Sequence, residues 1–479
     1  MIFLRKNWQI ILIILIASFV RFFHLYDYAE FLGDQGRDVV IVREFLRHGN
    51  LFFIGPQTSI GNMYLGPFYY YLFVAPGLIL SWFNPIGPAI VVAILGVLTV
   101  YLVYTYSLEW FDHKTAMIAS LIFALSPVVI KYSTFSWNPN VMPLFSLLFI
   151  HYLLKSRYIL ATIAFIICLN AHFLALLLLP VGFIIVVFKK PFPYRALILP
   201  FVILLASFIP QLLFDFKHQG QNINAFVSFF TKRETTINLK PYKAIPLMVP
   251  LFNQVTTRLV AGKDVIVGYF ISTIFGSTLI FILYQQFKKR KFDPHFLMLS
   301  SWLLIGLVGL ALYKQHIYDH YFGFLYPAII ILFAYLITRL PKFLSTIITI
   351  FVVIISLVQN PLRWSPPRQL WTTQEITKQI VASSENKPFN FSLLAKMNYD
   401  PGYRYFFSES NAPVRLLQDE ITEQLFVACE PFQMDCNPIN NPEWGIAAFG
   451  WAKIDKEWEV NGIKIFRLVH NQTGEKVIN

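Results

Sequence analysis

The chain has 479 residues, of which 56% are hydrophobic, 17% aromatic and only 14% charged, and its mean hydropathy is +0.56. This composition excludes an ordinary soluble protein and indicates an integral membrane protein. The formal net charge of +13 does not indicate nucleic-acid binding, because the basic residues fall in short clusters between apolar runs, such as KSR from Lys155 and KKRK from Lys288. Such clusters are typical of cytoplasmic loops rather than of one basic face.

The first apolar run extends from Trp8 to Tyr26 and follows Arg5 and Lys6. It has no small-residue cleavage site, and its ~19 residues are enough to cross a bilayer. We therefore expect a retained transmembrane helix rather than a signal peptide. The basic flank predicts that the N-terminus is cytoplasmic.

The stretch GDQGRDVVIVREFLRHGN, from Gly33 to Asn50, follows this run and is densely charged. From Asp38 onward its apolar residues recur at helical spacing, which predicts an amphipathic helix in the membrane interface. We expect Asp38 to cap its N-terminus and Gly49 its C-terminus. The expected apolar face comprises Val39, Val42, Phe45 and Leu46, and the polar face comprises Arg43, Glu44 and Arg47.

Asp34 lies between Gly33 and Gln35-Gly36, where we expect a turn ahead of that helix and just beyond the first membrane span. A carboxylate fixed at such a boundary can accept a proton from a hydroxyl nucleophile. The alternative is a solvated loop acid. Spacing alone does not decide between the two.

Further apolar runs follow, each near the ~20 residues needed to span the hydrocarbon, so we expect about eleven transmembrane helices. The runs after the first are Pro85 to Ser107, Thr115 to Tyr132, Asn140 to Leu154, Tyr158 to Ala171, Phe173 to Phe188, Ala196 to Phe214, Val265 to Phe287, Phe296 to Tyr313, Phe322 to Thr338 and Phe343 to Val358.

The segment Tyr64 to Phe83 decides the predicted topology, because it is apolar but interrupted by Pro67 and by Pro76-Gly77. Counting it as a full crossing would place KKRK outside, against the positive-inside rule. We therefore expect a re-entrant or surface-lying segment. If this segment does not cross the membrane, the pieces that face outward are residues 27–83, 215–264, 314–321 and everything after residue 359.

From Asn360 the apolar runs shorten and alternate, and Asn461-Gly462 is a strong signal for a two-residue hairpin turn. We expect residues 1–359 to form the transmembrane domain and residues 360–479 a small soluble α/β domain outside the cell membrane. Cys429 and Cys436 pair if their compartment is oxidising, and two free thiols are the alternative.

The runs GDQGRD, FLRHGNLFFIGPQTSIGNMYLGPFYYYL and FDHKTAMIASLIFALSPVVIKYSTFSWNPN resemble the polyprenyl-phosphate-dependent glycosyltransferases of the GT-C superfamily. More narrowly, they resemble glycosyltransferase family 39, which is related to protein O-mannosyltransferases and aminoarabinose transferases. The resemblance implies an α-helical integral membrane protein, a GT-C-like polytopic bundle with juxtamembrane helices, in the plasma membrane. It also implies that Asp34 is the catalytic or acceptor-binding carboxylate.

Two positions depart from the family pattern. Many members have Asp-Glu in the first loop and a basic residue before the proline of the juxtamembrane helix, whereas this chain has Asp34-Gln35 and Gly66-Pro67. Another basic group would therefore have to contact the lipid phosphate.

Moving a sugar from a lipid phosphate needs a base for the nucleophile and positive charge or hydrogen bonds for the departing phosphate. Cationic candidates occur beside Asp34, in LNAHFLAL and in KQHIYDHY, and aromatic and amide groups that suit a sugar occur in SWNPN. The alternative to substrate binding is a purely structural role for these residues, in interfacial turns and at hydrogen-bonded helix ends. The candidate substrate-binding residues are Arg37, Asp38, Tyr70, Trp137, Asn138, Asn140, His172, Lys314, His316, Tyr318, His320 and Tyr321.

The expected partners are a polyprenyl-phosphate-sugar donor, membrane lipids and an extracytoplasmic acceptor, with no nucleic acid. The sequence assigns no cofactor with certainty and leaves a divalent metal ion open, because His316, Asp319 and His320 are ligand types for one. Two other functions are left open. A secondary transporter would need ionisable groups near the membrane midplane. A polymerase or ligase of lipid-linked glycans would use basic residues in a late loop, here Arg233, Arg258 and Lys263.

Overall fold

The computed structural model describes residues 2–59, 61–232, 236–238, 240–430 and 436–471. It contains two compact units. The first, called here the helical unit, comprises Met1–Leu25, Asn50–Leu80 and Gly87–Ser365. The second, called here the sheet unit, comprises Tyr26–Gly49, Ser81–Ile86 and Pro366–Asn479. The sheet unit thus includes most of the charged stretch that follows the first apolar run.

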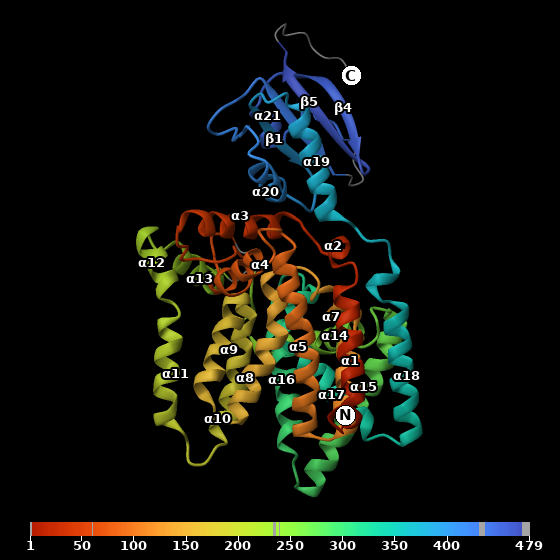
Figure 1. The fold of residues 1–479 in the computed structure, drawn as a ribbon. Helices are drawn as coiled ribbons and strands as arrows, with labels where there is room; N and C mark the ends of the chain where they lie inside the picture. Colours follow the sequence, from red (N-terminus) through yellow and green to blue (C-terminus); the bar gives the residue numbers. More distant parts are fainter. Residues whose placement is uncertain (1, 60, 233–235, 239, 431–435, 472–479) are drawn as a thin grey trace. The chain divides into compact units, whose positions relative to one another are not determined.

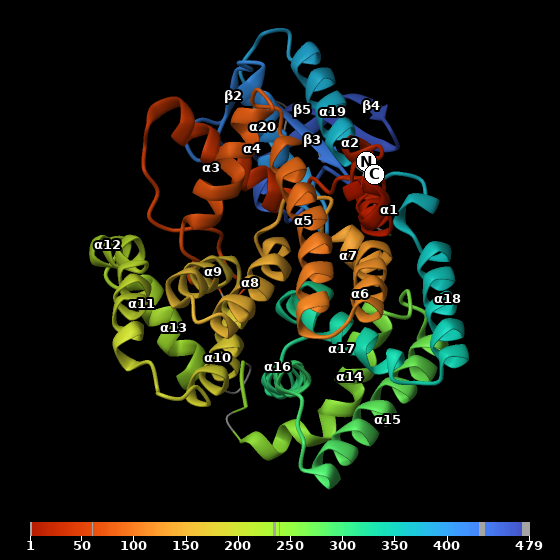
Figure 2. The same ribbon diagram turned by 60° about the horizontal axis from the view of Figure 1, so that its bottom comes forward.

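The helices of the helical unit lie side by side in both ribbon views (Figure 1 and Figure 2). They are α1 (Ile2–Phe22), α4 (Ala75–Leu80), α5 (Gly87–Trp110), α6 (His113–Leu125), α7 (Pro127–Lys131), α8 (Met142–Leu154), α9 (Tyr158–Ala171), α10 (Leu178–Val187), α11 (Tyr194–Ala206), α12 (Ile209–Lys217), α13 (Gln221–Thr231), α14 (Ile245–Leu259), α15 (Val265–Lys289), α16 (Pro294–Ala311), α17 (Tyr326–Thr338) and α18 (Lys342–Val358).

Within the described residues, five helical stretches are long and apolar enough to cross a membrane. They are Gly87–Trp110, Tyr194–Lys217, Val265–Lys289, Pro294–Ala311 and Asp319–Thr338. Shorter apolar helices account for most of the other predicted spans, including Asn7–Phe22 and Lys342–Val358. The structure therefore confirms a mainly helical protein with apolar membrane-length helices, and the number of about eleven spans stays a prediction.

The stretch Asp319–Thr338 forms the centre of this unit, with 94% of its apolar window buried. A helix that is apolar all round is expected in such a position. Arg21, near the end of α1, is also buried, with 1% of its surface exposed. Its guanidinium donates to the carbonyl oxygens of Ala124 at 3.1 Å and Ala17 at 3.2 Å. Because α6 ends at Leu125, the Ala124 carbonyl lies in its last turn, where carbonyls lack helical partners, and Arg21 ties α1 to that helix end.

Basic turns gather at one end of the helical unit, the lower end in Figure 1. Lys155 pairs with Glu109 at 2.7 Å, and Arg339 pairs with Asp112 at 3.0 Å. Lys189 donates to the carbonyl oxygen of Leu153 at 2.7 Å, which joins the turn after α10 to the turn that carries Lys155. The distribution is the one expected from the positive-inside rule.

The segment that decides the predicted topology contains a short helix. A π-helical turn, Tyr70–Val74, continues directly into α4. Together these 5 and 6 residues rise ~16 Å, well short of the ~30 Å of a hydrocarbon core. The length suits the expected re-entrant or surface-lying segment.

The sheet unit contains a five-stranded sheet in the order β2-β1-β3-β5-β4. Strand β1 (Phe389–Leu394) pairs in parallel with β2 (Val414–Arg415) and β3 (Gln424–Cys429), and β5 (Ile463–His470) pairs antiparallel with β3 and with β4 (Ala452–Val460). The helices of this unit are α3 (Gly33–His48), α19 (Gln369–Ser383), α20 (Pro401–Glu409) and α21 (Trp444–Ala447), and α2 (Leu25–Tyr28) lies at its boundary. The predicted small α/β fold is confirmed.

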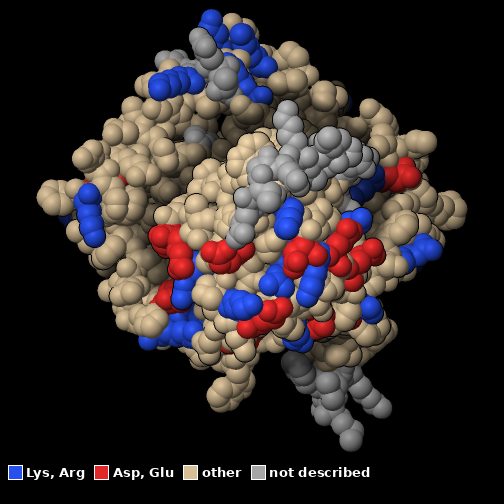
Figure 3. All heavy atoms as spheres, turned by 90° about the horizontal axis from the view of Figure 1, so that it is seen from above, with Lys and Arg blue, Asp and Glu red and all other residues tan. Residues whose placement is uncertain are grey.

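Alternation along β3 divides the core between the two faces of the sheet. Phe426 and Ala428 pack with residues of α19 and α20, whereas Leu425 and Val427 pack with Ile446 of α21. Acidic and basic side chains are interspersed on the face shown in Figure 3. Positive and negative charges are thus mixed on this face, as expected for a surface exposed to water.

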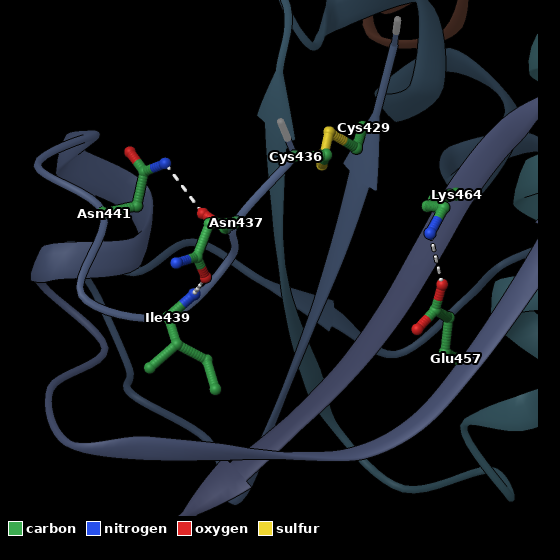
Figure 4. The surroundings of a disulfide bond; sticks show 7 residues. All are labelled: Cys429, Cys436, Asn437, Ile439, Asn441, Glu457 and Lys464. Carbon is green, nitrogen blue, oxygen red and sulfur yellow. Dashed lines mark hydrogen bonds and ion pairs between the residues drawn. A yellow bond between two sulfur atoms is a disulfide. The ribbon is translucent and has the colours of Figure 1, made fainter. Parts of the chain in front are cut away.

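One local prediction in this unit is confirmed, and one question that the sequence left open is decided. Asn461 and Gly462 both have positive φ, 54° and 77°, as a two-residue turn between β4 and β5 requires. Cys429, the last residue of β3, forms a disulfide with Cys436, and their Cα atoms are 6.2 Å apart (Figure 4). Such a bond is typical of proteins that face an oxidising compartment.

Candidate functional site

The carboxylate of Asp34 is held by two donors in the sheet unit. Its Oδ1 atom accepts a hydrogen bond from the Arg37 guanidinium at 2.8 Å and another from the Tyr399 hydroxyl. The Asp34 side chain is 36% exposed, so a small polar group can still approach it. A fixed and accessible carboxylate is what a general base requires.

Helix α3 differs from the prediction at its N-terminus. It begins at Gly33, so Asp34 lies in its first turn and not in a loop ahead of it. The helix start lies one turn earlier than expected because the Gln35 side chain accepts the Leu32 N–H at 2.9 Å and so caps that end. The expected C-cap is confirmed: Gly49 has φ 72°, and its N–H reaches the Phe45 carbonyl.

Asp38 is not the N-cap and is not exposed. Its side chain is 1% exposed and pairs with Arg37 at 2.7 Å. Arg43, which was expected on a polar surface, is also buried, and it donates to the Tyr405 carbonyl oxygen at 3.1 Å while its guanidinium lies 4.8 Å from the Tyr405 ring centre. Both expectations were wrong because one face of α3 packs on α20, a partner that local periodicity cannot reveal.

A second group of candidates lies in the helical unit around His320, in the short 3-10 segment Asp319–Leu325. The Trp137 ring centre is 4.4 Å from that of His320, and the Tyr321 ring centre is 4.5 Å away. Tyr318 stacks on His320 at 5.7 Å, and His172 contacts Tyr321 at 5.2 Å. The structure thus joins three predicted segments, SWNPN, LNAHFLAL and KQHIYDHY, into one aromatic and histidine-rich cluster.

The two asparagines of SWNPN hold the local backbone. Asn138 donates to the Ala171 carbonyl oxygen at 2.6 Å, and Asn140 donates to the Phe135 carbonyl oxygen at 2.9 Å. His172 follows the last residue of α9, and its Nδ1 accepts the Leu174 N–H at 3.1 Å. These contacts are hydrogen bonds at turns and helix ends, which is the structural role given above as the alternative to substrate binding.

Three further predicted residues of the helical unit make other contacts. Tyr70 is buried and contacts the Phe52 ring, their ring centres 5.2 Å apart. The His316 ring packs edge-on against Tyr318 at 4.5 Å. The backbone N–H of Lys314 donates to the Thr236 carbonyl oxygen at 2.9 Å, within a connection between two helices.

Two basic residues converge on Asp319, next to His320. Arg258 lies 3.2 Å from one Asp319 oxygen, and Lys263 lies 3.8 Å from the other. Burial lowers the pKa of Lys263, the nearby Asp319 opposes that shift, and Lys131 and Arg258 add to it. The sequence suggested Arg258 and Lys263 only for a glycan polymerase or ligase, and Arg233 from that suggestion lies outside the described residues. The charge interaction of Lys131 with Lys263 was missed because these two residues lie far apart in the chain.

Metal-ligating side chains do not gather in threes anywhere among the described residues. Of the three suggested ligands, Asp319 is engaged by Arg258 and Lys263.

The fold has solved relatives. ArnT from Cupriavidus metallidurans bound to undecaprenyl phosphate aligns with a TM-score of 0.64 and 13% identity, over 96% of this chain and 98% of that chain. In its apo state the values are 0.63 and 14%, over 97% and 98%. The archaeal oligosaccharyltransferase AglB from Archaeoglobus fulgidus, in complex with an inhibitory peptide and a dolichol-phosphate, aligns with a TM-score of 0.52 and 12% identity, over 89% and 70%.

No family profile and no curated protein matches the chain by sequence. The structural matches nevertheless extend over nearly the whole chain, whereas the resemblance in sequence is confined to its N-terminal part. The chain thus shares the fold of these solved structures, in line with the resemblance found in its sequence.

Proposed function

We propose that this chain with the GT-C fold is a membrane glycosyltransferase. It transfers a sugar from a polyprenyl-phosphate donor to a hydroxyl or amine acceptor on the extracytoplasmic side, in the glycosylation of a cell-envelope glycan, lipid or protein. The observation that carries the proposal is the combination of this fold over 96% of the chain with the accessible carboxylate of Asp34 in α3. Fold similarity alone would not assign an activity.

In the proposed reaction the acceptor oxygen or nitrogen forms a bond to the anomeric carbon of the sugar. The bond between that carbon and the phosphate oxygen breaks, and its electron pair leaves with the polyprenyl phosphate. Asp34 takes the proton that the acceptor loses, which is a general-base role. Arg37 holds the carboxylate through Oδ1 at 2.8 Å and keeps it oriented during the transfer.

Negative charge grows on the phosphate as it departs, and a cationic group stabilises it. We assign this role to Arg258 and Lys263, with Lys131 nearby, because they form a basic group beside the His320 cluster. Asp319 neutralises part of that charge and holds both side chains in place. The aromatic rings of Trp137 and Tyr321 in the same cluster offer flat surfaces on which a sugar or prenyl group can pack.

Replacement of Asp34 tests the proposed base. Asp34→Asn keeps the size of the side chain but removes its basicity, so the rate of sugar transfer should fall by at least ~100-fold. The measurement is polyprenyl phosphate released by the purified full-length chain from the lipid-linked sugars of its source membranes. Asp38→Asn is not a suitable control, because Asp38 is buried against Arg37.

Glu44→Gln is the matched control, because Glu44 lies on the exposed side of the same helix, with its side chain 52% exposed. It should transfer sugar at the wild-type rate. Wild-type turnover by Asp34→Asn would refute the base assignment. Joining of preformed glycan chains would instead identify a polymerase or ligase, and movement of sugar without lipid turnover would identify a transporter.

A further inference from the structure

The Tyr399 hydroxyl contacts the Asp34 carboxylate although the two residues lie 365 positions apart in the chain. Both belong to the sheet unit. Tyr399 lies just before α20 and is 44% exposed, so its ring borders solvent rather than the core of the unit. A half-exposed tyrosine contributes little to a hydrophobic core, which directs attention to its hydroxyl.

The direction of this hydrogen bond follows from the state of the phenol. Burial and the hydrogen bond to Asp34 raise the pKa of Tyr399 above its ordinary value. A raised pKa means that the phenol keeps its proton at neutral pH, so it donates and the carboxylate accepts. Arg37 donates to the same Oδ1 atom. Both hydrogen bonds thus end on Oδ1.

The segment that carries Tyr399 is itself fixed to α3. Asn398 accepts the Gly33 N–H at 2.7 Å through its side-chain oxygen and donates to Glu430 at 2.7 Å through its amide nitrogen. Tyr403 donates to the same Glu430 oxygen at 2.8 Å. Glu430 directly follows Cys429, which anchors the end of β3 through its disulfide. A chain of contacts thus extends from the sheet to the first turn of α3.

We infer that Tyr399 is a positioning residue for the Asp34 carboxylate, so that the C-terminal part of the chain helps to build the catalytic base. Tyr399 and Arg37 hold Oδ1, and Oδ2 takes the proton of the acceptor. The inference rests on the proposed function, because it concerns the same carboxylate. It predicts that Tyr399 acts only through Asp34.

A double-mutant cycle on the full-length chain tests this inference. Tyr399→Phe removes a single oxygen atom, and it should lower kcat by roughly tenfold or more, the effect of losing a hydrogen bond to a charged group. The KM for the lipid-linked sugar should stay within about twofold, because the phenol holds the base and not the donor. In the Asp34→Asn background, Tyr399→Phe should cause no further loss, because the base on which it acts is already gone.

Tyr405→Phe is the matched control. Tyr405 lies on α20, close to Tyr399 in the chain, but its hydroxyl donates to the backbone carbonyl of Phe83. Its ring contact with Arg43 survives the change, so this variant should keep the wild-type rate. Thermal unfolding of each variant, measured alongside, separates a loss of folded protein from a loss of rate.

Each outcome decides a different claim. Wild-type kcat in Tyr399→Phe would overturn the inference and leave the proposed function standing. Equal fractional losses in the wild-type and Asp34→Asn backgrounds would also overturn it, because Tyr399 would then act independently of Asp34. Wild-type turnover in Asp34→Asn would overturn the base assignment itself. If Tyr399→Phe lowers stability, the cycle still decides, because it compares the same change in both backgrounds.

Discussion

Two glycines of the GDQG run let α3 lie directly against the segment that carries Tyr399. A Cβ atom on Gly33 would lie 2.3 Å from the Tyr399 ring, and one on Gly36 would lie 2.2 Å from the Gly402 backbone nitrogen. Real Cβ atoms do not approach other atoms so closely. The spacing of these small residues therefore has a packing reason, and it places Asp34 between two points of close contact.

Gly36→Ala should destabilise the sheet unit. The added methyl meets the backbone of Gly402, which cannot turn away as a side chain can, so we expect a loss of about 1–3 kcal/mol in the free energy of unfolding. Sugar transfer should fall with it, because α3 and Tyr399 are forced apart. The measurement is thermal unfolding of the purified chain.

Gly276→Ala is the control for this change, since its added Cβ would meet only a Phe252 ring atom at the ordinary distance of 3.5 Å. It lies within α15, where alanine is preferred over glycine. An unchanged melting temperature for Gly36→Ala would show that α3 and α20 are not packed as described.

At the scale of elements, the short 3-10 segment before α17 brings acidic, histidine and tyrosine side chains together in consecutive positions. Asp319 meets Arg258 from the end of α14 and Lys263 from the following turn. His320 meets Trp137 from the start of another helix. Short 3-10 segments at helix ends present successive side chains in different directions, and here that geometry separates a charged side from an aromatic side.

Removing a positive charge from this cluster should weaken phosphate binding, whereas removing its negative charge should not. Arg258→Gln removes a cation and should weaken the binding of undecaprenyl phosphate by roughly tenfold or more. Asp319→Asn removes the competing anion and should leave binding unchanged or tighter, because both basic side chains become available to the phosphate. Binding is measured on the full-length chain in lipid nanodiscs by titration with undecaprenyl phosphate alone.

Lys288→Gln, at the exposed end of α15, is the control and should bind as the wild type does. Equal weakening by Arg258→Gln and Asp319→Asn would indicate that the ion pairs only support the fold. If neither change affects binding, the phosphate contact would be assigned instead to Lys314 and His316 in KQHIYDHY, and both can be neutralised in the same assay.

On the scale of the whole molecule, the distribution of charge predicts the orientation in the membrane. The turns after α8, α10, α15 and α17 carry the basic clusters, and the ion pairs of Lys155 and Arg339 hold neighbouring helix ends together at that end of the helical unit. The His320 cluster lies in connections at the other ends of these helices. Positive turns are retained in the cytoplasm, so the candidate substrate-binding residues should face outward.

Fusions with a compartment-specific reporter test this orientation. A reporter placed after Gln359 should be extracytoplasmic, and one placed at Lys289 should be cytoplasmic. Three helices, α16, α17 and α18, lie between the two positions, and an odd number of crossings places them on opposite sides. The disulfide of Cys429 and Cys436 agrees with an oxidising compartment for the sheet unit. Both reporters on one side would contradict the assignment and separate Asp34 from its proposed substrate.

Some features of this protein were determined by the sequence alone, because they depend on local physics. The apolar runs predicted the long helices, since crossing or filling a membrane requires a minimum length. Asn461-Gly462 predicted the hairpin, since a two-residue turn needs positive φ at both positions. Asp34 could be selected because it closely follows the first apolar run and lies within a recognisable family pattern.

Other features were decided only by the tertiary structure. The contact of Tyr399 with Asp34 joins residues 365 positions apart, and Arg258 meets Asp319 from a different helix. Asp38 appeared to be a helix cap because its spacing fitted one, but long-range packing buried it beside Arg37. Periodicity identifies which face of a helix is apolar, whereas the partner that covers this face depends on the fold of the whole chain.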